Sequence, residues 1–433
     1  MGNRKWIAGI VTAVLMGMAA GCSSRPAVEE SVQTSAERTE APSAEEQIVK
    51  PTAPSPSEIE PFPGAEKETK AEPLEGGKRI VVMTDIHYLA ESLTDGGDMF
   101  QSMVEHGDGK LTNYVWEITD AAFEEIQLLN PDVLIISGDL SLQGEKRSHE
   151  ELAGRLDALE RAGIAVVVIP GNHDINNPSA AVYSGMDRYP AEPTTPADFV
   201  SIYSEFGYSE ANSRDIHSLS YTYDLGPSMR LLMLDTCQYR PVAKVGGAIL
   251  SETYYWIEEQ LEEAWDEAMD VIPVAHHNLL EESKIYVDDC TIEHGEQLVD
   301  ILDEWDVKLF LSGHLHVQHT MRSEDNRGVW EAVTSSLATP ACQYGVLTCR
   351  DDGSYQYGTW SVDVESWARE HGRKERDLLE FRKFQEPFLR RVFYNQSMTA
   401  LNAVPDIPED RKKQMSDLYA RLNYYYYQGT AYQ

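Results

Sequence analysis

Short apolar runs alternate with helix-like segments between residues 79 and 317, and this alternation constrains the fold more than any other feature. Short runs that are apolar throughout are typical of strands buried on both faces. Strands that alternate with helices predict an α/β fold with crossover connections. The strands are predicted at 79–84, 133–136, 164–169, 219–225, 229–234, 271–275 and 308–311, and the helices at 114–129, 149–162 and 252–268.

The pattern changes after about residue 317. Short strands without long helices are predicted at 329–335, 344–349 and 355–360, and the chain from residue 362 onward has a helical, charged pattern. We therefore expect a main domain over 78–361 and a C-terminal helical extension over 362–433. We expect this extension, with its four tyrosines 424–427, to pack on the main domain and not to be a separate catalytic unit.

Residues that commonly bind metal ions follow five of the predicted strands directly. Ligands of open α/β sheets lie outside the carboxyl ends of the strands. Five loops at such ends are therefore expected to converge in one crevice. The five segments are Asp85-Ile86-His87, Gly138-Asp139, Gly171-Asn172-His173-Asp174, His276-His277-Asn278 and Gly313-His314-Leu315-His316.

The chemistry of these side chains narrows the kind of metal site. Imidazole together with carboxylate suits Zn, Fe, Mn or Co, whereas Ca and Mg prefer oxygen alone. The Asp-x-His and His-x-His spacings predict extended backbone, in which residues i and i+2 share a face. Gly138, Gly171 and Gly313 allow close backbone approach just before the ligands. The candidate ligands are too many for one tetrahedral ion, so we expect two ions that share one carboxylate.

This ordered set of motifs resembles the calcineurin-like metallophosphoesterase family, over residues 79–360. The resemblance implies an α/β fold of two facing β-sheets flanked by helices, a four-layer α-β-β-α sandwich. It also implies a metal-dependent phosphoric ester hydrolase, a phosphodiesterase or phosphatase that hydrolyses a small phosphoester through a metal-activated water.

The resemblance assigns roles to individual residues. It implies that His173 faces the substrate as general acid and that Asp174 orients His173 or its loop. His277 and Asn278 are candidate substrate-side or supporting groups. Leu142 stands where purple acid phosphatases place a tyrosine ligand, so a tyrosinate–ferric site is not expected. The ligands of one ion would be Asp85, His87 and His316. The ligands of the other ion would be Asn172, His276 and His314. Asp139 would bridge the two ions.

The net charge of the chain helps to distinguish a phosphoesterase of small substrates from a protein that binds nucleic acid. Lys plus Arg is 36 and Asp plus Glu is 72, which gives a formal charge of −36. A protein that binds nucleic acid through a basic face is therefore not expected. A nuclease of the same fold remains open, because a local basic groove is compatible with this total. A catalytically silent surface protein that uses the fold for binding is a third alternative. No His-Glu-x-x-His motif of zinc peptidases occurs.

The N-terminus, residues 1–22, resembles a bacterial lipoprotein signal peptide. Arg4 and Lys5 precede an apolar run over 6–20 that is too short for a typical transmembrane helix. The run ends in Ala20-Gly21-Cys22, which resembles a lipobox. The resemblance implies that Cys22 is lipidated and that the protein is anchored to the cell membrane outside the cytoplasm.

Residues 23–77 are rich in Pro, Ser and Glu, which predicts a disordered spacer. The segment 176–214 is long for a connection between core elements, and such segments often form lids. Its Tyr183, Met186 and Tyr189 are candidate substrate contacts. The remaining cysteines, Cys237, Cys290, Cys342 and Cys349, allow three disulfide pairings, and their spacing favours buried free thiols.

Overall fold

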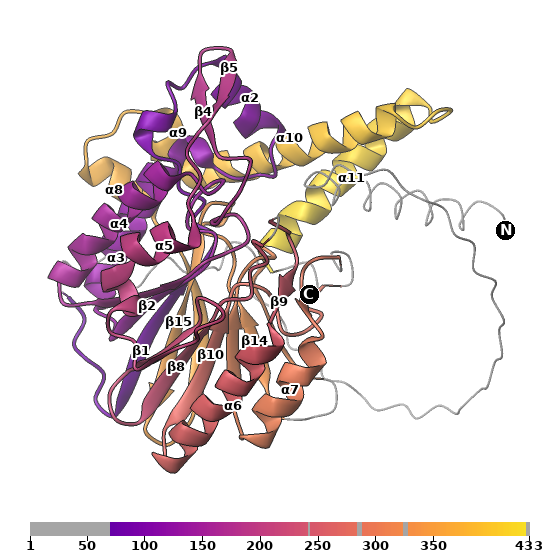
Figure 1. The fold of residues 1–433 in the computed structure, drawn as a ribbon. Coiled ribbons are helices and arrows are strands. Elements are labelled where there is room, and N and C mark those ends of the chain that lie inside the picture. The colour runs from indigo at the N-terminus through magenta and orange to yellow at the C-terminus, as the bar shows by residue number, and fades with distance from the viewer. Residues whose placement is uncertain (1–69, 241–242, 284–287, 324–327, 430–433) are drawn as a thin grey trace, which may run out of the picture. The chain divides into compact units, whose positions relative to one another are not determined.

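Two β-sheets lie at the centre of the fold, and helices cover their outer faces (Figure 1). The computed structural model describes residues 70–240, 243–283, 288–323 and 328–429. The predicted signal peptide, Cys22 and most of the spacer lie outside these residues. Most strands of the two sheets come close to the predicted ranges, which confirms the alternating pattern, but the short edge strands at 213–214 and 319–322 were not predicted.

The first sheet has the order β16-β15-β1-β2-β3. Its β1, β2 and β3 run parallel, and β15 pairs antiparallel with both β1 and β16. The parallel strands place three carboxyl ends at the same edge. The strands are β1 (Gly77–Met83), β2 (Val133–Ser137), β3 (Ala165–Ile169), β15 (Gln343–Arg350) and β16 (Tyr355–Ser361).

The second sheet has the order β13-β14-β12-β10-β8-β7-β6. Its β8, β10, β12 and β14 run parallel, with antiparallel strands at both edges. The strands are β6 (Ser213–Arg214), β7 (Tyr221–Asp224), β8 (Met229–Leu234), β10 (Asp270–Ala275), β12 (Leu309–Ser312), β13 (His319–Arg322) and β14 (Trp330–Val333).

The alternation of side chains along β8 separates two layers of core. Leu231 and Met233 belong to the cluster that also contains the first sheet, whereas Leu232 and Leu234 pack with α6 and α7. Successive side chains of a strand point to opposite faces, so a strand buried on both sides serves both layers. With α3 and α4 on the other sheet, the arrangement is the predicted four-layer sandwich. The helices named here are α3 (Val115–Leu129), α4 (Lys146–Arg161), α6 (Ser251–Asp266) and α7 (Gly295–Glu304).

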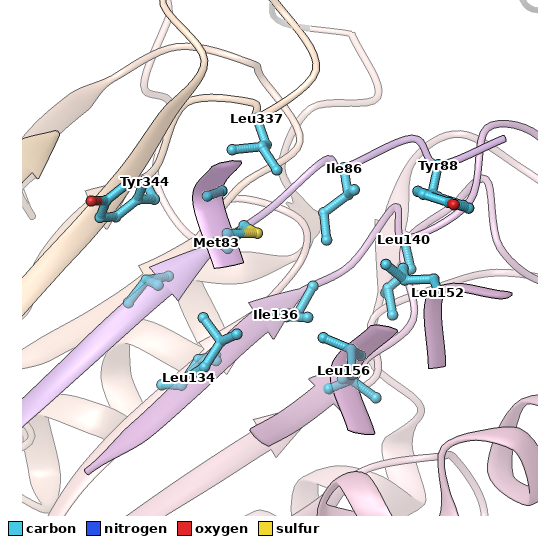
Figure 2. Packing of buried hydrophobic residues seen from close by; sticks show 14 of the residues in the cluster. Met83, Ile86, Tyr88, Leu134, Ile136, Leu140, Leu152, Leu156, Leu337 and Tyr344 are labelled. Carbon is cyan, nitrogen blue, oxygen red and sulfur yellow. The ribbon is translucent and has the colours of Figure 1, made fainter. Parts of the chain in front are cut away.

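Close packing of β2 against α4 shows how the sheet holds the site in place. Leu134 and Ile136, two residues apart on β2, face Leu152 and Leu156, four residues apart on α4 (Figure 2). All four are fully buried. Each side chain of this size contributes about 1.5–3 kcal/mol on burial, so the strand that leads to Asp139 is firmly anchored.

The C-terminal extension is helical, as predicted. Its α10 and α11 form a hairpin (yellow in Figure 1), and Phe381, Phe388 and Val392 of α10 belong to the main core cluster. The extension therefore packs on the main domain through apolar side chains. Its helices are α8 (Val364–Glu370), α9 (Arg376–Leu379), α10 (Phe381–Asn402) and α11 (Glu409–Tyr427).

The remaining elements are short. The segment 176–214 contains its own hairpin and helices and is not an irregular loop. These elements are β4 (Ala181–Ser184), β5 (Asp187–Pro190), α5 (Pro196–Ile202) and the π-helical turn Ser204–Tyr208. Elsewhere lie α2 (Asp98–His106), the 3-10 turns Glu91–Leu93 and Thr112–Tyr114, and the pair β9 (Gly247–Ala248) and β11 (Ile292–Glu293).

Two further findings concern the cysteines and the helices. Cys237, Cys290, Cys342 and Cys349 are free thiols. Among the residues that the structure describes, no helix combines the length and the apolar character that crossing a bilayer requires.

Candidate metal centre

The five predicted loops meet where the carboxyl ends of strands from both sheets come together. Asp85 and His87 follow β1, Asp139 follows β2 and Asn172 follows β3. From the second sheet, His276 follows β10, and His314 and His316 follow β12. All seven predicted ligands are thus brought to one place, although more than 230 positions separate the first from the last.

The prediction of extended backbone at the Asp-x-His and His-x-His pairs is wrong. Asp85, His87, His314 and His316 all have φ between 47° and 68°, and Asp139 has φ 50°. This left-handed region is uncommon for residues other than glycine, although Asp and His enter it more readily than most. Each such residue costs of the order of 1–3 kcal/mol and persists only where the surroundings enforce it. The chain turns sharply after each strand and so aims consecutive ligands inward.

Gly138 illustrates the close approach predicted for the glycines. Its φ is 99°, and a Cβ at this position would lie 2.5 Å from Nδ1 of His276. Real atoms do not approach so closely, so only glycine allows the loop before Asp139 to pack against this ring. The two sheets are therefore in direct contact at the site.

One group of donor atoms is formed by Asp85, His87 and His316. Nε2 of His316 lies 3.1 Å from Oδ1 of Asp85 and 3.2 Å from Nε2 of His87. Nε2 of His87 lies 3.6 Å from the same Oδ1. Ligands about 2.0–2.2 Å from one ion are separated by roughly 3.0–3.5 Å. The spacing of this group therefore fits a shared metal ion.

A second group is formed by Asn172, His276 and His314. Nε2 of His276 lies 3.1 Å from Oδ1 of Asn172 and 3.2 Å from Nδ1 of His314. It is His276, and not its neighbour His277, whose ring faces the cluster. This spacing fits a second ion by the same criterion.

Asp139 lies between the two groups. Its Oδ2 is 3.7 Å from Nε2 of His87 in the first group and 3.4 Å from Nε2 of His276 in the second. Its other oxygen, Oδ1, accepts a hydrogen bond of 2.8 Å from the backbone N–H of His173. The carboxylate is thus fixed with one oxygen directed toward both groups, which is the position of a bridging ligand.

The charge state of the site also fits metal ions. Asp85 and Asp139 are buried. Burial opposes their ionisation, but the neighbouring histidines outweigh it and hold the pKa of both carboxyls well below its usual range. Buried carboxylates are found paired or coordinating metals. The nitrogen and oxygen donors, without sulfur, suit the metals predicted from the sequence.

The histidines differ in protonation. Burial, together with the ammonium of Lys110, lowers the pKa of His87 to about 3. Burial and the charge of His276 lower the pKa of His314 to about 4. Both rings are therefore neutral at neutral pH, the form that binds metals. Burial also disfavours the charged form of His276, but the carboxylates of Asp139 and Asp85 outweigh it and raise its pKa to about 9.

Supporting hydrogen bonds orient several of these ligands. Oδ2 of Asp85 accepts bonds from the Thr84 hydroxyl at 2.7 Å and the His314 N–H at 3.0 Å, which leaves Oδ1 for the cluster. Nδ1 of His276 lies 2.9 Å from the carbonyl oxygen of Ser137. Partners of this kind fix the tautomer and the orientation of metal-binding rings.

His173 borders the same cluster. Its Nδ1 lies 3.0 Å from the Leu142 carbonyl oxygen, and its Nε2 lies 3.9 Å from Oδ2 of Asp139. The side chain is 16% exposed. Burial lowers its pKa, and the charge of Asp139 partly offsets this effect. A carbonyl can only accept a hydrogen bond, so Nδ1 is the donor and Nε2 is directed to the site.

The hydrogen bonds of the Asp174 carboxylate go to groups other than the His173 side chain. Its carboxylate instead accepts bonds from the N–H groups of Leu140, Ser141 and Gly171 at 2.8–3.1 Å. These bonds join the loop that carries Asp139 to the loop that carries Asn172. Of the two roles that the sequence left open, the geometry supports orientation of the loop.

His277 and Asn278 lie away from the space above the cluster. His277 is fully buried between the Thr236 hydroxyl at 2.7 Å and the Val245 carbonyl at 2.8 Å. Asn278, also fully buried, donates to Ser312 and Gly313 in the loop after β12. Their placement supports a role in positioning the site and not a contact with substrate.

A cavity of about 190 Å³ opens above the cluster. Its wall also contains residues that the sequence analysis did not assign to the site, among them Asp108, Lys110 and Tyr427. Tyr183, Met186 and Tyr189 are not part of this wall. The lining residues are Asp108, Lys110, Asp139, Asn172, His173, Val245, Cys290, His314, Leu315, His316 and Tyr427.

Comparison with known proteins agrees with this geometry. The family described as calcineurin-like phosphoesterase matches residues 78–318, more than half of the chain. The chain belongs to the calcineurin-like phosphoesterase family. The predicted resemblance and fold class are thereby confirmed, and a metal-dependent phosphoric ester hydrolase is supported. A second family, the C-terminal domain of cyclic nucleotide phosphodiesterase, matches residues 363–433.

Curated relatives of this phosphoesterase carry related names. A "probable cyclic nucleotide phosphodiesterase" of Moraxella catarrhalis is 21% identical over 46% of this chain. A Synechococcus protein of the same description is 24% identical over 45% of the chain. The matches span 64% and 62% of those proteins' own lengths, just under two thirds. A 3′,5′-cyclic-nucleotide phosphodiesterase of Nostoc is 23% identical over 66% of this chain and 91% of its own length.

Among solved structures, a dimetal phosphatase from Danio rerio aligns with a TM-score of 0.45 and 12% identity. The alignment covers 66% of this phosphoesterase chain and the whole of the other.

Proposed function

We propose that the protein is a phosphodiesterase with two metal ions, and that its substrate is a small phosphodiester of the 3′,5′-cyclic nucleotide class. The observation that carries this proposal is the position of Asp139, whose Oδ2 lies within 3.7 Å of donor atoms in two separate ligand groups. The names of the curated relatives favour a diester over a monoester. The small volume of the cavity favours a small substrate over a polymer.

The donor groups define which residues would hold the ions. Asp85, His87 and His316 would hold one, Asn172, His276 and His314 the other, with Asp139 shared. Such a pair of ions supplies Lewis-acid activation of the phosphoryl group and of the attacking water. The protein contributes the fixed positions of the ligands and the removal of bulk water around two buried carboxylates.

His173 is the group that would move a proton. Its Nδ1 is occupied by the Leu142 carbonyl, so only Nε2 is available to the cavity. In the imidazolium form, Nε2 can donate its proton to the leaving oxygen of the ester. General acid catalysis of this kind contributes about 10²–10⁴-fold in rate. The backbone N–H of His173 also holds Oδ1 of Asp139, so the loop couples the proton donor to the bridging carboxylate.

The test uses the full chain with Mn, Fe, Zn or Co added singly. Hydrolysis of bis(p-nitrophenyl) phosphate, p-nitrophenyl phosphate and a 3′,5′-cyclic nucleotide is followed for wild type, Asp139→Ala and His173→Ala. His294→Ala is the matched control, because His294 is an exposed histidine outside the site. We expect metal-dependent turnover that favours diesters, is lost in Asp139→Ala, falls in His173→Ala most for the cyclic nucleotide with its poor leaving group, and is retained in the control.

The same assay separates the alternatives. Protein that holds two ions but turns over none of these substrates contradicts the proposal and favours the silent binding role. Preference for the monoester contradicts the assignment as a diesterase. Hydrolysis of DNA or RNA in preference to the cyclic nucleotide favours the nuclease.

We also propose that the protein acts outside the cytoplasm, tethered through a lipid on Cys22. The support is the sequence of residues 1–22 alone, which resembles a lipoprotein signal peptide. We expect the wild-type chain in the membrane fraction of a bacterial host and Cys22→Ser released from it or retained as unprocessed precursor. Equal membrane association and processing of both would contradict the proposal.

A further inference from the structure

Lys110 is the only lysine or arginine among the described residues that line the cavity. Its side chain is 6% exposed, and its ammonium pairs with Oδ2 of Asp108 at 2.6 Å. The Asp108 side chain is 56% exposed, so the carboxylate also has access to solvent. A cation is therefore held on the wall of a cavity whose floor contains Asp139, Asn172 and His173.

The segment 107–111, which we call the lysine loop, is held by the C-terminal hairpin α10–α11. The side-chain amide of Gln396 on α10 donates to the carbonyl oxygen of Gly107. Gly109 has φ 92°, and a Cβ there would lie 2.4 Å from Cδ1 of Leu389 on α10. On its other side, the N–H of Leu111 bonds the Ala338 carbonyl at 2.7 Å. The loop thus sits between α10 and the segment after β14, with little freedom.

The same hairpin supplies Tyr427 at the end of α11. Its ring stacks on Phe393 of α10, with centroids 5.5 Å apart, and lies 6.1 Å from the ring of His316. The carbonyl oxygen of Tyr427 accepts a bond from Ser335 at 3.4 Å. The end of the hairpin is therefore joined to the main domain beside the predicted ligands.

We propose that Lys110 binds a phosphoryl oxygen of the substrate, and that the C-terminal hairpin serves to hold the lysine loop and Tyr427 as one wall of the active site. This inference rests on the proposed function and deepens it. The physical reason is charge. The chain has a formal charge of −36, and a phosphoester is an anion. A desolvated ammonium beside the site offers a charge-assisted hydrogen bond, which is stronger than a neutral one.

The direct test is calorimetric titration of inorganic phosphate into the Mn-loaded full chain. We expect Lys110→Met to weaken phosphate binding about 10- to 100-fold, the usual effect of losing one charged hydrogen bond. Lys110→Arg keeps the charge but changes its reach and geometry, so it should lose affinity measurably, by about 2- to 10-fold. KM for bis(p-nitrophenyl) phosphate should rise in parallel, while metal content stays at the wild-type level.

Lys308→Met is the matched control. Lys308 pairs with Asp306 two positions before it, as Lys110 pairs with Asp108, but it is 48% exposed and outside the cavity. Its phosphate affinity should equal that of wild type. Equal affinity of Lys110→Met and wild type would overturn the assignment of Lys110. If Lys110→Met fails to fold, Lys110→Arg carries the test, since a purely structural cation would leave its phosphate affinity unchanged.

The role of the hairpin is tested separately with Gln396→Met, which removes the bond to the lysine loop. We expect phosphate affinity to fall about 3- to 10-fold, from the loss of a neutral hydrogen bond. When Gln396→Met is combined with Lys110→Met, phosphate affinity should fall no further than in Lys110→Met alone, because both substitutions act through the ammonium of Lys110. Additive effects would overturn the positioning role.

Failure of the proposed function is distinguishable from failure of this inference. Wild type that turns over no phosphoester contradicts the function, yet phosphate affinity still reports on Lys110. Wild-type turnover together with unchanged phosphate affinity in Lys110→Met contradicts the inference alone. Wild type that binds no phosphate overturns the inference directly.

Discussion

The strand-end loops and the C-terminal hairpin meet at one cavity, but they contribute to it in different ways. The loops supply the predicted metal ligands from short motifs, with five of the seven residues in left-handed backbone. The hairpin supplies the ring of Tyr427 to the cavity. Its helix α10 packs against the lysine loop and so positions Lys110. The metal ligands are thus specified by short local motifs, whereas the wall of the cavity is specified by packing between segments that are distant in the sequence.

The two regions also differ in what stabilises them. Strain at Asp85, His87 and Asp139 is offset by the sheets from which the loops emerge, whose strands are almost wholly buried. The two helices of the hairpin are held by apolar contacts such as Leu389 and Phe393, and its left-handed residue, Asp406 with φ 65°, lies in the connection between them. Changes in the loops should therefore affect metal binding and turnover first, and changes in the hairpin should affect substrate affinity first.

The largest effect is expected for Asp139→Asn. It weakens the ligand that lies between the two groups, so turnover should fall about 10³-fold or more, beyond the 10- to 100-fold typical of residues that only support a ligand. Metal content should fall below two ions per chain, which elemental analysis measures. Full metal content with wild-type turnover would show that Asp139 does not bridge.

His173→Gln should reduce turnover by about 10²–10⁴-fold and leave metal content unchanged. The residue borders the cluster, but its assigned task is to carry a proton at Nε2. The loss should be smaller for an ester whose leaving group is very acidic, because such a group needs little protonation. Equal losses for good and poor leaving groups, or loss of a metal ion, would instead assign His173 as a ligand.

Glu125→Gln tests the junction between the main domain and the extension. Burial raises the pKa of Glu125 to about 7, against the hydrogen bonds from the Asp363 N–H at 2.7 Å and the Tyr344 hydroxyl at 2.9 Å. The folded state therefore binds this proton more tightly than the unfolded state, whose pKa is near 4.5. The contribution of Glu125 to the free energy of unfolding is therefore largest below pH 4.5. It declines as the pH rises from 4.5 to about 7 and does not change further above pH 7.

Between pH 4.5 and pH 7, the contribution of Glu125 to the free energy of unfolding falls by about 3 kcal/mol. Urea unfolding at about pH 5 and about pH 8 should show it in the wild type. The difference between the two pH values should be smaller in Glu125→Gln, because the amide does not titrate. An identical pH dependence in the two proteins would contradict the raised pKa.

The smallest change in stability is expected for Gly138→Ala. The residue has φ 99° and no room for a Cβ beside His276. Strained backbone of this kind costs about 1–3 kcal/mol. Chemical denaturation measures this loss, and metal affinity should fall with it because the His276 ring must move. Gly163→Ala is the control for backbone strain alone, because Gly163 has a positive φ but open space where a Cβ would lie.

The sequence predicted the strands, their order as α/β elements and the ligand motifs, because these depend on local patterns. It did not predict the backbone at Asp85 and His314, because a spacing of two residues suits both an extended strand and a sharp turn. Lys110 and Tyr427 were not assigned to the site. No motif marks either residue, and they meet at the cavity across more than 300 positions of sequence. His277 stands beside a predicted ligand, yet the β10 loop directs it to Thr236.

The central claim is that two ions share Asp139 and act together. The most direct measurement is the turnover of bis(p-nitrophenyl) phosphate by the full chain as metal is titrated into metal-free protein, with bound metal measured at each point. We predict that activity follows occupancy of the second ion and reaches its maximum at two ions per chain. Maximal activity at one ion per chain, or activity that does not depend on bound metal, would contradict the account.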